Sequence, residues 1–88
     1  MFNELDNQRP QIDYPCEWGY KVIGTDVDKI LFAIEEAAFG MEYSVTPSNI
    51  SRNGKYFSLN FTINVPNEVV RDLVYEKLQK DQDVKIVL

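Results

Sequence analysis

Strict alternation of apolar and polar residues from Phe57 to Val65 limits the possible folds of this chain more than any other feature. A period of two places alternate side chains on opposite faces of a β-strand, so one face is buried and the other is open. The apolar positions are Phe57, Leu59, Phe61, Ile63 and Val65. The polar positions, together with the tyrosine before them, are Tyr56, Ser58, Asn60, Thr62 and Asn64. The first set is expected in a core, and the second set is expected on an uncovered face.

Two helices are predicted, one before this strand and one after it. The first covers 26–39, with Thr25 as its N-cap and Asp28 as the capping-box partner. Gly40 follows it, where a left-handed C-cap is expected. The second covers 67–80 and begins at Asn67, another N-cap residue type. Their apolar stripes are Val27, Ile30, Leu31, Ile34 and Ala38 in the first helix, and Val70, Leu73, Val74 and Leu78 in the second.

Three further segments are predicted to be strands. The first, "EWGYKVIG", alternates in polarity and ends at Gly24. The second, "MEYSVTPSNIS", contains Pro47, which fits an edge strand or a bulge because proline lacks an N–H donor. Asn53-Gly54 then predicts a hairpin turn into the alternating strand. The last strand, "DVKIVL", ends the sequence.

The resulting order, β-α-β-β-α-β, predicts an α+β fold of the ferredoxin-like sandwich type. Two amphipathic helices are expected to cover one face of a four-stranded antiparallel sheet. Right-handed crossovers place the first and third strands in the centre and the others at the edges. Residues 15–88 form a single domain in this interpretation, and residues 1–14 form a flexible N-terminal tail.

The composition excludes several kinds of chemistry within one chain. There is no histidine and Cys16 is the only cysteine, so neither a zinc site nor a histidine-activated nucleophile can be built. No metal and no other cofactor is therefore expected. A lone cysteine and the lack of a secretory signal favour a cytoplasmic location. The net charge of −5 disfavours nucleic acid and anionic membranes as partners, and no segment is apolar enough to span a bilayer.

The open face of the predicted sheet is the candidate binding surface. Tyr56, Ser58 and Asn60 place hydrogen-bonding groups and one aromatic ring there. Arg52 and Lys55 form a local basic spot at the hairpin tip, where free backbone N–H groups suit an anion. A solvated sheet face and a solubilising hairpin tip explain the same residues more simply. RNA binding is disfavoured, because it requires several stacked aromatic side chains and a basic surround.

Three separated motifs occur in an order that is typical of a family of small bacterial proteins. They are "DYPCEWGYKVIG", "PSNISRNGKYFSLNFTINV" and "VYEKLQKDQDVKIVL", and they lie within residues 13–88. On these motifs the chain resembles the YbeD-like family of unknown function, although Arg52 stands where that family often has serine. The resemblance implies a ferredoxin-like fold close to the ACT regulatory domains. Since ACT domains bind small effectors near the loop after the first strand, it adds Gly24 and Thr25 to the candidate residues.

We therefore expect a non-catalytic regulatory or protein-interaction module that binds an unknown protein partner or a small polar ligand. A small acylphosphatase-like enzyme is one alternative. It is disfavoured because the loop "GTDVDK" is acidic and lacks the arginine that such an enzyme uses to hold phosphate. A structural subunit of a larger assembly is the other alternative, and a homodimer is compatible with each of these functions.

Overall fold

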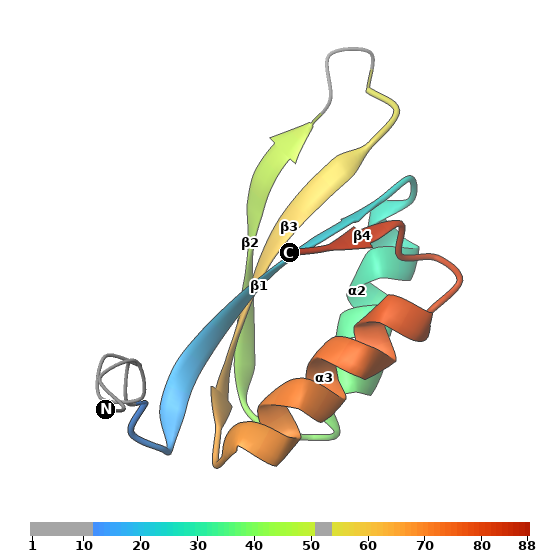
Figure 1. Cartoon of the computed structure of the whole chain (residues 1–88). Helices are drawn as coiled ribbons and strands as arrows, with labels where there is room; N and C mark the ends of the chain where they lie inside the picture. Colours follow the sequence, from blue (N-terminus) through green and yellow to red (C-terminus); the bar gives the residue numbers. More distant parts are fainter. Residues whose placement is uncertain (1–11, 51–53) are drawn as a thin grey trace, which may run out of the picture.

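The computed structural model describes residues 12–50 and 54–88 and has the predicted order of elements (Figure 1). They are β1 (Cys16–Gly24), α2 (Val27–Ala38), β2 (Tyr43–Ile50), β3 (Phe57–Val65), α3 (Glu68–Lys80) and β4 (Ile86–Val87). Both helices match the predicted ranges closely, whereas the last strand is much shorter than predicted. The predicted hairpin tip covers 51–56, and its residues 51–53, which include Arg52, lie outside the described residues.

The strands form one antiparallel sheet in the order β2-β3-β1-β4, so β1 and β3 are central, as predicted. Both helices lie against the same face of this sheet (Figure 1). Among the described residues the other face carries no helix. The expected ferredoxin-like sandwich is therefore confirmed.

Pro47 lies in the edge strand β2, opposite Leu59, and the register shifts between Pro47 and Asn49. The backbone of Lys21 in β1 bonds to Leu88 on the β4 side, which fixes the alternation across the sheet. By this alternation Thr46 directs its backbone groups toward β3, and Pro47 faces the outer edge. The missing N–H of Pro47 therefore costs the sheet no ladder hydrogen bond.

The N-cap of α2 differs from the prediction. Asp26, not Thr25, is the cap, and its Oδ1 accepts a hydrogen bond from the backbone N–H of Lys29 at 3.2 Å. Both residue types cap helices well, and the chain enters the helix one residue later than expected. At the other end Phe39 adopts the left-handed conformation with φ of 53°, followed by Gly40 with φ of 77°.

The buried faces of the helices also differ in part from the predicted stripes. Leu31 in α2 and Leu73 in α3 are exposed. Ala33 and Ala37 are buried instead, because small side chains allow α2 to approach the sheet closely. In α3 the predicted cap is confirmed, since Oδ1 of Asn67 accepts a hydrogen bond from the backbone N–H of Val70 at 2.9 Å.

Phe61 of β3 lies at the centre of the hydrophobic core. Its side chain is fully buried, with the Tyr20 ring stacked at 5.6 Å and the Tyr43 ring edge-on at 5.6 Å between centroids. The apolar face of β3 packs toward the helices, as the alternation predicts. The buried apolar residues of the core are Tyr20, Val22, Ile30, Ala33, Ile34, Ala37, Ala38, Leu59, Phe61, Ile63, Val65, Val74, Leu78 and Val84.

Candidate functional site

The polar face of β3 lies on the uncovered side of the sheet and forms part of an open hollow. In the register of the sheet, Asn60 lies between Lys21 of β1 and Thr46 of β2, and Thr62 lies opposite Gly19. Gly19 has no side chain, and a Cβ built on it meets nothing within 4 Å, so the surface is low at this point. We call this surface the open-face hollow; it is lined by Gly19, Tyr20, Lys21, Thr46, Asn60, Thr62 and Leu88.

The open-face hollow suits recognition of polar groups. Asn60 offers both donors and acceptors, two threonine hydroxyls lie beside it, and Lys21 adds a cation. These side chains stand on paired strands whose backbone is already fixed, so little conformational entropy is lost when a partner binds. Among the described residues no group of three or more histidine, cysteine or acidic side chains could hold a metal ion. The geometry supports binding by hydrogen bonds and charge.

The structure places the described site residues that were predicted in four different settings. Asn60 lines the open-face hollow. Lys55 and Tyr56 lie just before β3, where the Lys55 ammonium is 5.7 Å from the centroid of the Tyr56 ring. Arg52 lies outside the described residues, so its pairing with Lys55 stays a prediction.

Ser58 is placed differently from its neighbours on the open side of β3. It lies between Ile23 of β1 and Asn49 of β2 in the register, and only 8% of its surface is exposed. Its Oγ has no hydrogen-bond partner in the described part of the chain. Because so little of Ser58 is exposed, it offers a partner little accessible surface in this conformation.

Gly24 and Thr25 lie at the end of β1, away from the residues that line the open-face hollow. Gly24 has a packing reason to be glycine, because a Cβ there would lie 2.6 Å from the backbone oxygen of Asp83 and 3.0 Å from the Ile30 side chain. Thr25 is exposed and does not cap α2. Their predicted role in effector binding rests on the resemblance alone.

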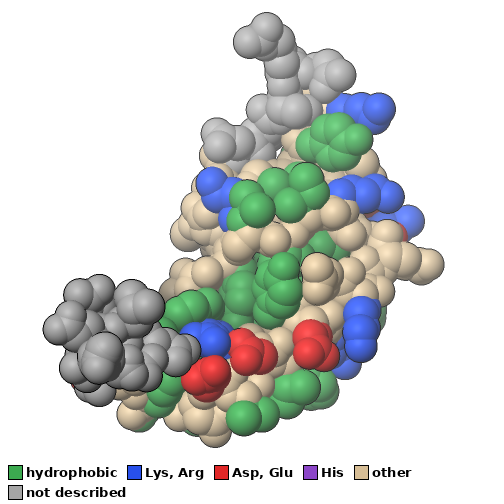
Figure 2. All heavy atoms as spheres, viewed as in Figure 1, with side chains coloured by type: hydrophobic (Ala, Val, Ile, Leu, Met, Phe, Trp, Pro, Cys, Tyr) green, Lys and Arg blue, Asp and Glu red, His purple; other side chains and the backbone are tan. Residues whose placement is uncertain are grey.

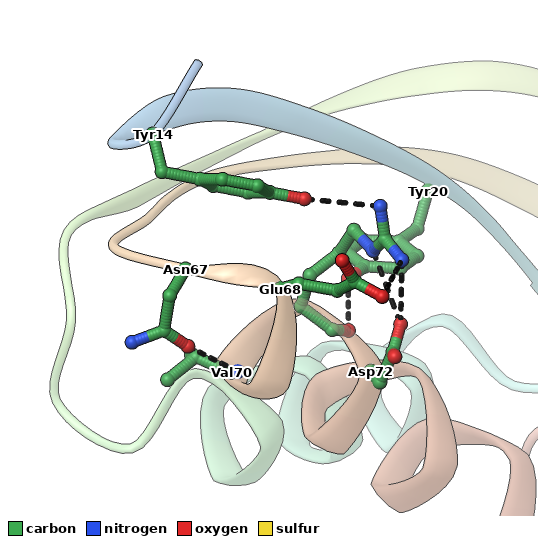
Figure 3. A network of polar contacts seen from close by, with 7 residues as sticks. Tyr14, Tyr20, Asn67, Glu68, Val70 and Asp72 are labelled. Carbon is green, nitrogen blue, oxygen red and sulfur yellow. Dashed lines mark hydrogen bonds and ion pairs between the residues drawn. The ribbon is translucent and has the colours of Figure 1, made fainter. Parts of the chain in front are cut away.

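A polar cluster at the other end of β1 was not anticipated from the sequence. Arg71 of α3 donates from Nη1 to the Tyr14 hydroxyl at 3.0 Å (Figure 3). Its guanidinium lies 4.7 Å from the Trp18 ring centroid. We call this set the Arg71 cluster; it comprises Tyr14, Trp18, Tyr20, Glu68, Arg71 and Asp72. The Arg71 side chain at its centre is only 19% exposed.

Hydrogen bonding and burial raise the pKa values of two members of the Arg71 cluster, Arg71 and Tyr20. Arg71 Nε donates to Asp72 Oδ1 at 3.1 Å, and this hydrogen bond raises the pKa of the guanidinium further. Glu68 forms a second ion pair at 3.7 Å. The Tyr20 hydroxyl donates to the backbone oxygen of Arg71 at 2.6 Å, and burial raises the pKa of Tyr20 to about 12. The cluster holds the segment before β1 against α3, and Tyr14 lies one residue before the predicted domain boundary.

An exposed apolar surface lies on the helix side of the molecule. Phe32 and Phe39 of α2 are 61% and 65% exposed, and the Lys77 ammonium of α3 lies 4.4 Å from the Phe39 ring centroid. Glu35 and Glu36 lie between the two aromatic residues in the sequence. This surface competes with the open-face hollow as a place for a partner, and it serves below as a comparison.

The order of the elements and of the strands defines the ferredoxin-like fold, which an ACT domain of known structure shares. The ACT domain from GTP pyrophosphokinase of Chlorobium tepidum matches with a TM-score of 0.58, covering 82% of this chain and 94% of that one. At 23% identity this likeness shows the fold alone. No helix in the described ranges is long and apolar enough to cross a membrane.

The family model "Protein of unknown function (DUF493)" matches residues 9–88, and the chain belongs to that family. A UPF0250 protein of Hahella chejuensis is 34% identical over 89 residues, covering 97% of this chain and 98% of the relative. An uncharacterised protein of Campylobacter jejuni, Cj0253, is 36% identical over 80 residues, covering 90% and 92%. The solution structure of HP0495 from Helicobacter pylori matches at 30% identity with a TM-score of 0.81, covering 94% of this chain and 91% of that one. The expected membership of the YbeD-like proteins of unknown function is confirmed.

Proposed function

We propose that this protein is a non-catalytic module that binds a protein partner across the open face of its sheet. The observation that carries the proposal is the open-face hollow, where Lys21, Asn60 and Thr62 stand around the bare backbone of Gly19. Hydroxyl and amide side chains on rigid strands suit recognition, and they offer no nucleophile with an activating base. The ACT-like fold supports a regulatory role of this kind.

A protein partner fits this surface better than a small ligand. Small-molecule sites are concave and bury most of their ligand, whereas the open-face hollow lies on an uncovered sheet face. Apolar side chains flank it, since Leu88 is 70% and Ile86 is 49% exposed at the β4 side. A wide, open surface that combines polar groups with a few exposed apolar side chains is typical of protein interfaces. The proposal includes the cytoplasmic location that the single cysteine favours.

The test is capture of partners from bacterial lysate, followed by variants of the captured complex. Asn60→Lys places a large charged side chain in the open-face hollow, and we expect it to weaken binding at least about tenfold. Gln79→Lys on the exposed end of α3 is the matched control, because it also replaces an amide side chain by lysine, and it should leave binding and the melting temperature nearly unchanged. Arg71 is unsuitable as a helix-surface control, because it belongs to the Arg71 cluster. Normal binding by Asn60→Lys together with loss of binding in Phe32→Ala would move the site to the helix side.

A further inference from the structure

The β4 side of the central strand β1 is only half covered. β4 pairs with Val22 and Ile23, and Leu88 exchanges two backbone hydrogen bonds with Lys21, at 3.0 and 2.9 Å. β1 continues well beyond that point toward its N-terminal end, with no strand beside it on this side among the described residues (Figure 1). β1 therefore has an uncovered stretch of edge that begins where β4 ends. We call this stretch, which carries Glu17 and Gly19, the notch.

The notch presents backbone groups that point outward. In an antiparallel ladder alternate residues direct both N–H and C=O to the same neighbour, so Glu17 and Gly19 face the same side as Lys21. Their backbone groups have no hydrogen-bond partner within 12–50 and 54–88, and both residues are exposed. An exposed row of unpaired backbone donors and acceptors is a template for another strand. The notch is long enough for about four or five residues of an extended chain.

The surroundings of the notch favour a positively charged strand. On the helix side Glu68 and Asp72 of α3 keep 68% and 58% of their side chains exposed, beside Trp18 and Arg71. On the open side the notch is bordered by the exposed residue Glu17. Figure 2 shows hydrophobic side chains in the hollow between the end of β4 and α3, with acidic side chains below them. Three carboxylates stand against two cations, the already paired Arg71 and Lys21 at the β4 end of the notch, so the rim is acidic on balance.

We propose that the notch binds an extended, basic segment of a partner protein, which adds to β1 as a strand in line with β4. Its backbone exchanges hydrogen bonds with Glu17 and Gly19, and its lysines or arginines meet the acidic rim. Its alternate small apolar side chains face Trp18 on one side and the bare backbone of Gly19 on the other. A second copy of this chain is disfavoured here, because two-fold pairing would bring the acidic rims of both copies together. This inference deepens the proposed function, since it names the partner's chemistry and a contact that the open-face hollow does not supply.

The probe is the peptide acetyl-Val-Lys-Val-Lys-Val-amide, titrated into the full chain labelled with ¹⁵N. We expect amide shifts concentrated at Glu17, Gly19, Lys21 and Leu88, and slower hydrogen exchange at Glu17 and Gly19. The same peptide with glutamate for lysine should bind at least about tenfold more weakly, because it meets the acidic rim with like charge. N-methylation of the two peptide amides that face β1 should abolish binding, while methylation of the alternate amides should not.

Variants of Gly19 test the strand geometry from the protein side. Gly19→Pro removes one N–H donor of the notch, and an edge position tolerates proline. Gly19→Pro should weaken binding of the peptide at least about tenfold. Gly19→Ala keeps the N–H and should change binding less than about threefold. Thermal unfolding shows whether either variant disturbs the fold, and the N-methylated peptides keep the test decisive because they leave the protein unaltered.

Several results would overturn the proposal. Peptide shifts that map to Phe32 and Phe39 would place binding on the helices, and equal binding by the glutamate peptide would remove the role of charge. Concentration-dependent shifts at Gly19 without peptide would assign the notch to a second copy of the chain. The two proposals separate, since Asn60→Lys should leave peptide binding unchanged and weaken capture of the open-face partner. Loss of peptide binding in Asn60→Lys would place the peptide in the open-face hollow and would contradict strand addition at β1.

Discussion

The buried hydroxyl of Ser58 has no hydrogen-bond partner in the described structure, and such a group costs about 1–3 kcal/mol in lost bonds to water. We predict that Ser58→Ala leaves the free energy of unfolding unchanged or raises it by up to about 1 kcal/mol, measured by urea denaturation. Asn60→Ala, at a more exposed position on the same side of β3, is the control for loss of a polar side chain. A loss above about 1 kcal/mol in Ser58→Ala would show that the hydroxyl is bonded in solution.

Tyr20 provides a pH-dependent prediction. Because burial raises its pKa from 10.0 to about 12, the folded state keeps the proton after the unfolded state has lost it. Its contribution to stability is therefore full below pH 10 and falls as the pH rises from 10 toward 12. Tyr20→Phe should remove the loss of stability that Tyr20 causes at alkaline pH. At neutral pH it should lower the free energy of unfolding by about 1 kcal/mol, because the hydrogen bond to the Arg71 backbone is lost.

Urea unfolding of Tyr20→Phe at neutral and alkaline pH checks this prediction, with ultraviolet absorbance following the ionisation of tyrosine. The wild-type protein should show one late-titrating tyrosine that is missing from the variant. Tyr75→Phe, at an exposed tyrosine of α3, is the control and should leave the late step in place. A late step that persists in Tyr20→Phe would contradict the assignment.

The helix α2 shows how far an element follows from its sequence and where the inference stops. Its existence and range follow from apolar spacing, and its contact with the sheet follows from amphipathicity. The exposed position of Leu31 and the burial of Ala33 did not follow, because they depend on how closely the helix approaches the sheet. The Arg71 cluster was missed for a related reason, since Tyr14 and Arg71 are 57 residues apart and only the fold brings them together. Asn60 was predicted because strand alternation alone assigns its face.

The N-cap of α2 gives a prediction at the scale of a single helix. Asp26→Ala should lower the free energy of unfolding by about 1 kcal/mol, because it removes the side-chain acceptor for the Lys29 N–H and an anion from the positive end of the helix. Thr25→Ala is the matched control and should have little effect, since Thr25 is exposed and outside the cap. Urea denaturation of both variants decides the matter. A larger loss of stability in Thr25→Ala than in Asp26→Ala would instead make Thr25 the cap, as the sequence pattern predicted.

At the scale of the whole molecule, the acylphosphatase-like alternative can be tested directly, because such an enzyme would combine this fold with an arginine that holds phosphate. The loop after β1 contains acidic residues and no arginine, and Asp26 is used as a helix cap. We predict no turnover of benzoyl phosphate above the buffer rate, measured by loss of substrate absorbance at neutral pH. A catalysed rate that disappears in Lys55→Ala or Arg52→Ala would show phosphate chemistry at the hairpin tip and would contradict the non-catalytic assignment.

The two edges of the sheet are unlike, and this limits how the folded protein can polymerise. Fibril elongation through sheet edges requires that each added molecule offer a fresh edge to the next. The β2 edge carries Pro47 and a shifted register, so it accepts another strand poorly. A molecule that docked through β1 would present only this closed edge to solvent. Growth would therefore terminate after the first addition, and the folded protein is expected to resist fibril formation even when it is concentrated.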